Sequence, residues 1–141
     1  MGIATLIFLQ FIAGFAATLI FHQPVIWGLH RAGISPRPAY AMKGVPPFGV
    51  PSVISLSFWG GLWGMVMLHL LYPLHDRGAI YWIAATLFGA IFPTLVAVLV
   101  VVPLKKIVVA NRGQLFAVGM LVNGAWGIGT ALLYHALTRF V

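Results

Sequence analysis

Residues 43–72 read KGVPPFGVPSVISLSFWGGLWGMVMLHLLY. A proline-rich segment leads directly into about 20 apolar residues, the length that a helix needs to cross the hydrocarbon core of a bilayer. Within that run the motif WGGLWG (residues 59–64) places glycines at a spacing of four. Small residues at this spacing let helix backbones approach closely in lipid. The stretch therefore predicts a membrane helix that packs through a glycine face.

The composition extends this prediction to the whole chain. Of its 141 residues, 62% are hydrophobic and 6% are charged. In a water-soluble domain about a quarter of the residues are charged, so the surface of this protein is expected to face lipid. Helices satisfy their own backbone polar groups in a bilayer. We therefore expect an all-α integral membrane four-helix bundle, a single transmembrane domain over residues 1–141 with helices at about 2–27, 52–72, 79–102 and 114–140.

The basic residues predict how the chain is oriented. The net charge is +7, and most of the cations lie in two connections between apolar spans: Arg31, Arg37, Lys43, Lys105, Lys106 and Arg112. The opposite side carries Arg77 and Arg139. Positive residues are enriched in cytoplasmic loops, so both termini are expected outside. Orientation in the membrane explains the placement of these residues in short loops better than nucleic acid binding does. Three of them, Arg31, Arg37 and Lys43, are expected to contact anionic lipid headgroups and are here called the loop-one cations.

An internal repeat predicts the order of the helices. The string AATL at 16–19 recurs at 84–87, and each copy precedes a proline, Pro24 or Pro93. The string GLWG at 61–64 recurs as GAWG at 124–127. Two helices per repeat give both halves the same orientation in the membrane. The sequence therefore predicts two tandem transmembrane helical hairpins.

Two kinds of helix face are candidate sites. Small or amide residues predict close helix packing at Gly60, Gly64, Gly119, Asn123 and Gly127. Polar residues predict an inner face on the first and last helices, made by Gln10, Thr18, His22, Thr130 and Tyr134. This inner face supplies either hydrogen bonds that hold the bundle together or a path for a solute. Hydrogen bonding is favoured because no Asp or Glu lies within a span.

The sequence predicts no catalytic site and no metal site. It has no cysteine, no paired carboxylates, and no two histidines at metal-ligand spacing within one helix. A haem pair is disfavoured because His22 is expected at one end of the bundle and His69 and His135 at the other. His69 and His135 are expected at similar depth, but on a helical wheel His69 points away from Gly60 and Gly64. The tryptophans beside the glycines, Trp63 and Trp126, are expected to fill the space that the glycines open, with stacking on a pigment or quinone as the alternative.

Four runs carry a resemblance to a known family: FHQP at 21–24, PPFGVP at 46–51, FWGG at 58–61 and VNGAWG at 122–127. They resemble small four-helix proteins of the bacterial inner membrane that have no assigned activity. The resemblance implies a four-helix protein of the bacterial inner membrane, for which the outside expected of both termini is the periplasm, and it implies no function.

Three functions are weighed for the chain. The favoured one is a non-enzymatic accessory subunit of a larger membrane complex, in contact with partner helices and with lipid, quinone or pigment molecules. The alternatives are a small oligomeric solute transporter or channel, and a haem-binding electron-transfer subunit. The expected partners are membrane lipids together with another membrane protein or further copies of this chain.

Overall fold

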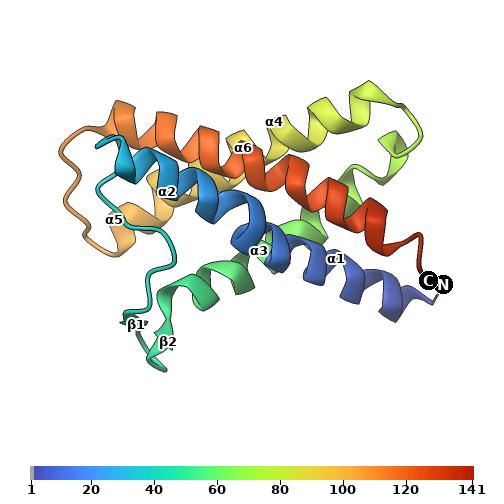
Figure 1. Cartoon of the computed structure of the whole chain (residues 1–141), viewed down its shortest axis with the longest axis horizontal. Coiled ribbons are helices and arrows are strands. Elements are labelled where there is room, and N and C mark those ends of the chain that lie inside the picture. Colours follow the sequence, from blue (N-terminus) through green and yellow to red (C-terminus); the bar gives the residue numbers. More distant parts are fainter. Residues whose placement is uncertain (1) are drawn as a thin grey trace.

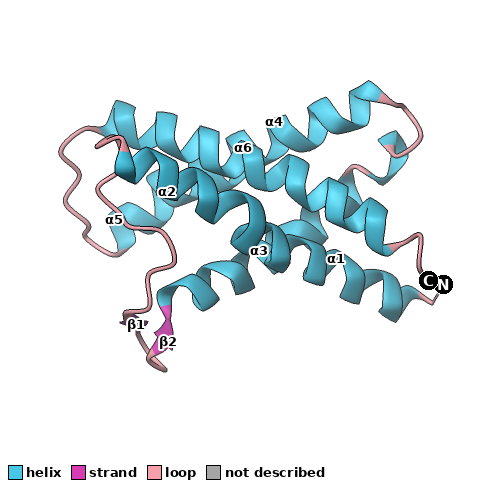
Figure 2. Ribbon diagram, in the orientation of Figure 1, coloured by secondary structure: helices cyan, strands magenta, loops and turns pink. Residues whose placement is uncertain are grey.

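The fold is seen in a computed structural model that describes residues 2–141. Four long helices follow one another in alternating directions (Figure 1). Helices make up most of the chain, and the two strands are very short (Figure 2). In chain order the elements are α1 (Ile3–Ala17), the π-helical η1 (Thr18–His22), α2 (Gln23–Arg31), β1 (Gly44–Val45), β2 (Val50–Pro51), α3 (Ser52–Leu70), the 3-10 helix η2 (Tyr72–Leu74), α4 (Ala79–Val96), the π-helical η3 (Ala97–Val101), α5 (Val102–Leu104) and α6 (Arg112–Leu137).

The predicted all-α class is confirmed. Four continuous helical stretches are long and apolar enough to cross a membrane by length and composition: Ile3–Arg31, Ser52–Leu70, Ala79–Leu104 and Arg112–Leu137. Their ends differ by a few residues from the predicted ones, most of all in the first helix, which continues beyond residue 27 to Arg31. The hydropathy pattern marks where apolar side chains stop, whereas polar residues such as His30 continue the helical backbone.

The two ends of the bundle differ in character. The ends of the chain and the turn between α3 and α4 lie together, on the right of Figure 1, and the loops at 32–51 and 105–111 lie at the opposite end. We call the latter the basic end, because six of the eight Lys and Arg residues of the chain lie in or beside its loops. Its first loop contains the antiparallel pair of β1 and β2, in which Val45 is opposite Val50.

Helix packing is dominated by two pairs, α1 with α3 and α4 with α6. The last helix, α6, also packs along α1, whereas α3 makes few contacts with α4 or α6. The buried apolar side chains come from all four long helices and include Leu9, Met67, Phe88 and Trp126. Large apolar side chains remain exposed around the outside of the bundle, as expected of helices that face lipid.

The two halves share a glycine crossing, which keeps the register of the predicted GLWG/GAWG match but not that of the AATL match. Gly14 of α1 faces Gly64 of α3, and Gly89 of α4 faces Gly127 of α6. The glycines of α1 and α4 are separated by 89 − 14 positions, whereas the AATL strings are separated by 84 − 16, a difference of seven residues or about two helical turns. The AATL match therefore pairs the correct helix faces but is displaced along the helix by two turns, because two turns return a residue nearly to the same face.

Candidate functional site

Three helices meet at a junction of glycines near the middle of the bundle. We define the glycine junction as Gly14 of α1, Gly60 of α3 and Trp126 of α6. Trp126 is 2% exposed, and its indole N–H donates to the carbonyl oxygen of Gly14 at 3.0 Å. A Cβ on Gly60 would meet Oγ1 of Thr18 and would lie 3.2 Å from the indole nitrogen of Trp126. The glycines therefore leave no room for a side chain, and Trp126 fills the space between the helices.

The same close approach occurs within each helix pair. A Cβ built on Gly64 would lie 2.8 Å from the Cα of Gly14, and one built on Gly127 would lie 3.1 Å from the Cα of Gly89. Both distances are shorter than an ordinary van der Waals contact, and the neighbouring atoms belong to backbones that cannot move independently of their helices. These glycines therefore set the separation between α1 and α3 and between α4 and α6.

A third contact joins α6 to α4 nearer the basic end. The side-chain amide of Asn123 donates to Oγ1 of Thr94 at 2.9 Å, and Thr94 is 1% exposed. A Cβ on Gly119 would lie 2.7 Å from Cγ2 of the same threonine. All five residues predicted to pack helices thus lie at helix contacts, with Thr94 as a partner that the glycine spacing did not reveal.

The residues predicted to form a polar inner face divide into two groups. Thr18 and Thr130 each donate their hydroxyl to the carbonyl four residues earlier in the same helix, at 3.1 and 2.8 Å. Nε2 of Gln23 donates to Nδ1 of His22 at 3.3 Å. Thr18, Thr130 and His22 are therefore each hydrogen-bonded to a group of their own continuous helix. Gln10 and Tyr134 lie closer to the chain ends, where their side chains neighbour each other.

The first loop is fastened to the first helix at its π-helical segment. The N–H of Gln23 is bonded to the carbonyl of Thr18, and Pro24 has no N–H, so the carbonyl of Leu19 lacks a donor from its own helix. The hydroxyl of Tyr40 donates to that carbonyl at 2.7 Å. The backbone N–H of Tyr40 also donates to Oε1 of Gln23 at 2.7 Å. We call these contacts the loop latch.

Further hydrogen bonds hold the same loop between the first and last helices. Nδ1 of His30 donates to the carbonyl of Ser35 at 2.8 Å. The side-chain amide of Gln114, in the first turn of α6, donates to the carbonyl of Ile34 at 2.6 Å. Prolines restrict the backbone of this loop, but neither they nor the hydropathy indicated these hydrogen-bond partners. The sequence signal that could have indicated the latch is Pro24, because a proline within an apolar span leaves a helical carbonyl without its usual N–H donor.

The loop-one cations are exposed at the basic end. The guanidinium carbon of Arg31 lies 5.0 Å from the centre of the Trp27 ring, and Trp27 is 54% exposed. Arg37 and Lys43 belong to the loop fastened by the latch. The arrangement combines a cation with an exposed aromatic ring at one end of an apolar helix, as is typical of residues at a membrane surface.

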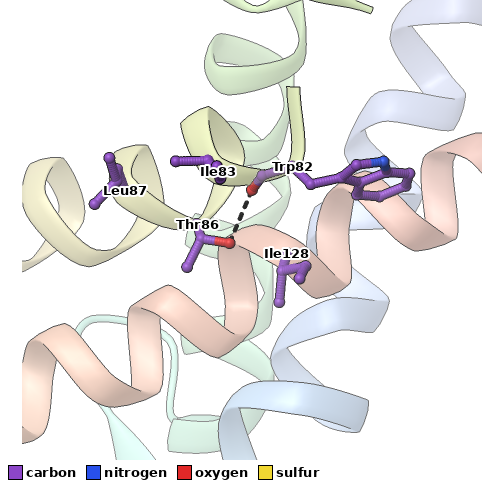
Figure 3. Close-up of a pocket in the computed structure, with 5 residues that line it drawn as sticks. All are labelled: Trp82, Ile83, Thr86, Leu87 and Ile128. Atoms are coloured by element: carbon purple, nitrogen blue, oxygen red, sulfur yellow. Dashed lines mark hydrogen bonds between the residues drawn. The ribbon is translucent and has the colours of Figure 1, made fainter. Parts of the chain in front are cut away.

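Two surface cavities accompany these contacts. The α4/α6 groove has a volume of about 240 Å³ and is lined by Trp82, Ile83, Thr86, Leu87 and Ile128 (Figure 3). The hydroxyl of Thr86 donates to the carbonyl of Trp82 at 2.9 Å, as the dashed line in Figure 3 shows. Because this hydroxyl is already bonded to its own helix, the groove presents a nearly apolar wall.

The second cavity lies at the opposite end from the basic loops. It has a volume of about 390 Å³ and is lined by Leu6, Gln10, His69, Tyr72 and Pro73, and we call it the Gln10 cavity. Its lining residues come from α1, from the end of α3 and from the 3-10 helix η2. His69 was assigned no site from the sequence, because it does not share a helix face with the glycines of α3.

The remaining histidines of this end lie against aromatic rings. The ring centre of His75 is 5.3 Å from that of Tyr81 and 5.8 Å from that of His135. Within residues 2–141 there is no group of three or more His, Cys, Asp or Glu side chains that could hold a metal ion.

Comparison with known protein families, with curated proteins and with solved structures finds no significant match to this chain.

Proposed function

We propose that this chain is a multi-pass membrane protein that serves as a non-enzymatic accessory subunit of a larger membrane assembly. In this proposal its two tandem helical hairpins cross a bacterial inner membrane, with the termini in the periplasm. The subunit contributes a closed, rigid body against which partner helices and lipids pack. It carries no reaction of its own.

The observation that supports this role most directly is how the predicted inner-face hydroxyls are used. Thr18 and Thr130 direct their hydroxyls to carbonyls of their own helices, and Trp126 closes the glycine junction between them. A path for ions or polar solutes needs polar groups that face water along its length. Here the middle of the bundle is filled instead, which favours a packing role.

The outer surface supports contact with partner helices. Helix α3 packs extensively on α1 alone, and its outward side exposes large apolar and aromatic side chains: Ile54, Phe58, Trp59, Val66 and Leu70. Aromatic residues are enriched in protein interfaces. We propose this outward side of α3 as the face toward a partner protein. The α4/α6 groove, which is apolar and open to the outside, suits a lipid acyl chain (Figure 3).

The basic end supports the proposed orientation. Its loops hold six of the eight Lys and Arg residues, and cytoplasmic loops carry such an excess. Reporter fusions after Pro38 and after Lys106 are expected to read cytoplasmic. A periplasmic signal from either fusion contradicts the topology.

The test of the accessory role is purification from native membranes in a mild detergent, after chemical crosslinking. We expect a larger membrane protein in stoichiometric amount, identified by mass spectrometry. Trp59→Ala should reduce that recovery, whereas Leu99→Ala, an exposed position on η3, is the matched control and should not. A homo-oligomer without a partner, whose recovery neither variant changes, contradicts the proposal.

A second candidate function is solute transport by an oligomer, and one observation favours it. The first and third helices each contain a π-helical segment directly before a proline-containing turn, at Thr18–His22 and Ala97–Val101. Such segments interrupt regular helical hydrogen bonding and are frequent at functional sites. Flux of a solute by the purified protein in liposomes would support transport and contradict the accessory role.

A further inference from the structure

The Gln10 cavity has a polar floor and a mixed rim. Gln10 is 3% exposed, whereas Tyr72 is 68% exposed, so the cavity runs inward from η2 toward α1. Leu6 and Pro73 add apolar lining. None of the five lining residues is an acid, a lysine or an arginine. The cavity therefore suits a neutral molecule with an apolar body.

The amide of Gln10 has more hydrogen-bonding capacity than its surroundings use. A glutamine offers two N–H donors and a carbonyl acceptor. The polar neighbour on the helix side is Tyr134, and one phenol engages at most part of that capacity. Tyr134 in turn neighbours Tyr81, whose hydroxyl is buried without a hydrogen-bond partner. The Tyr81 hydroxyl does not line the cavity, and the part of the Gln10 amide that Tyr134 does not engage is left for whatever fills the cavity.

The unused hydrogen-bonding capacity of the amide indicates what fills the cavity. A buried N–H that has no acceptor is unfavourable, because lipid offers no replacement for water. At the mouth, the His69 imidazole and the Tyr72 hydroxyl can each donate one further hydrogen bond. Three donors around an apolar wall match a ligand that carries carbonyl acceptors. The volume of about 390 Å³ lies within the range of small-molecule sites.

We propose that the Gln10 cavity binds the carbonyl-bearing head of a neutral membrane amphiphile, with the side-chain N–H of Gln10 donating to that carbonyl. The inference rests on the proposed function and deepens it, because it gives the accessory subunit a specific ligand. Two sources carry this chemistry: the ring carbonyl of a membrane quinone and the acyl ester of a glycerolipid. Because the cavity opens beside η2, at the end of α3, the polar head would lie near the membrane surface with its chain toward the bilayer.

The test measures binding to the full chain in maltoside micelles. Decylubiquinone is titrated while tryptophan fluorescence is followed, since a bound quinone quenches nearby indoles, and dihexanoylphosphatidylcholine is then added as a competitor. We expect saturable quenching, weakened about 3- to 10-fold by Gln10→Met, which keeps the side-chain length and removes the amide. The lipid concentration that displaces half of the bound quinone is compared with the quinone concentration that half-saturates the site. A lower value for the lipid assigns the site to the lipid ester, and a lower value for the quinone assigns it to the quinone.

Two matched variants separate this site from its neighbours. Leu87→Ala alters the α4/α6 groove, and Tyr81→Phe removes a hydroxyl that does not line the cavity, so both should bind as the unaltered chain does. Thermal melting of each variant establishes that it is folded. Equal affinity of the unaltered chain and a folded Gln10→Met, or quenching that never saturates for either probe, overturns the inference. Recovery of a partner protein is scored separately, so the failure of one proposal leaves the other standing on its own measurement.

Discussion

Replacing Gly64 by alanine is the most direct test of the packing between α1 and α3. The new Cβ would lie 2.8 Å from the Cα of Gly14 and 3.0 Å from the carbonyl oxygen of Gln10. Ordinary contact begins at 3.4 Å, so the two helices must separate locally by about 0.6 Å. Both neighbours are backbone atoms, and no rotamer change relieves the clash.

The magnitude follows from two opposing terms. Forcing one extra carbon into a well-packed contact costs about 1–3 kcal/mol. Alanine is a better helix former than glycine by about 0.5–1 kcal/mol, which offsets part of that cost. Gly28 provides the matched control, because it lies in α2 and a Cβ there would have nothing within 4 Å. Gly28→Ala retains the propensity gain alone, so the two variants should differ by about 1–3 kcal/mol in unfolding free energy.

The assay is thermal and denaturant unfolding in detergent, followed by circular dichroism, for the unaltered chain and both variants. We expect Gly28→Ala to unfold at the same or a slightly higher temperature and Gly64→Ala at a lower one. Gly127→Ala should behave like Gly64→Ala, because its Cβ would lie 3.1 Å from the Cα of Gly89. The reasoning is refuted if Gly64→Ala is as stable as Gly28→Ala.

Three further outcomes are expected. Trp126→Phe removes the hydrogen bond to Gly14 and leaves unfilled space at the glycine junction, and should lower the unfolding free energy by about 2–3 kcal/mol; an unchanged value contradicts the assigned contact. Tyr40→Phe leaves the Leu19 carbonyl without its donor, so limited proteolysis should cut the first loop faster than in the unaltered chain. Neutralising the loop-one cations should weaken retention of anionic lipid by about 1 kcal/mol per cation, measured by native mass spectrometry; equal lipid retention would place these residues away from the headgroups.

The number and class of the helices were predictable because hydropathy is a property of side chains summed over a long window. Four apolar stretches of sufficient length permit one backbone structure in lipid. The glycine face was predictable for a similar reason, since a spacing of four places Gly60 and Gly64 on one side of any helix. Both signals depend on local sequence alone.

The features that were not predicted depend on residues far apart in the chain. A π-helical segment inserts one residue into a helix without altering its hydropathy, so Thr18–His22 left no mark on the pattern. The loop latch pairs Tyr40 with Leu19, and the Gln10 cavity pairs α1 with η2, each across a separation that periodicity does not encode. No pattern in the sequence assigned Tyr40 a hydrogen-bond partner, because the Leu19 carbonyl needs an outside donor only where Pro24 removes a helical N–H.

The hydrogen bond between Trp126 and Gly14 joins the last helix to the first, 112 positions apart. A ribosome delivers the helices in order, so α1 and α3 can pair as soon as the first half has been inserted, while the other side of α1 still faces lipid. The junction is completed only when the final helix arrives. Biogenesis of this protein therefore ends with a closing step, and a chain that stops before α6 would retain its first helix pair but leave α1 half uncovered. Such a truncated product presents the α6-facing side of α1 to the bilayer, because Gly14 remains covered by α3.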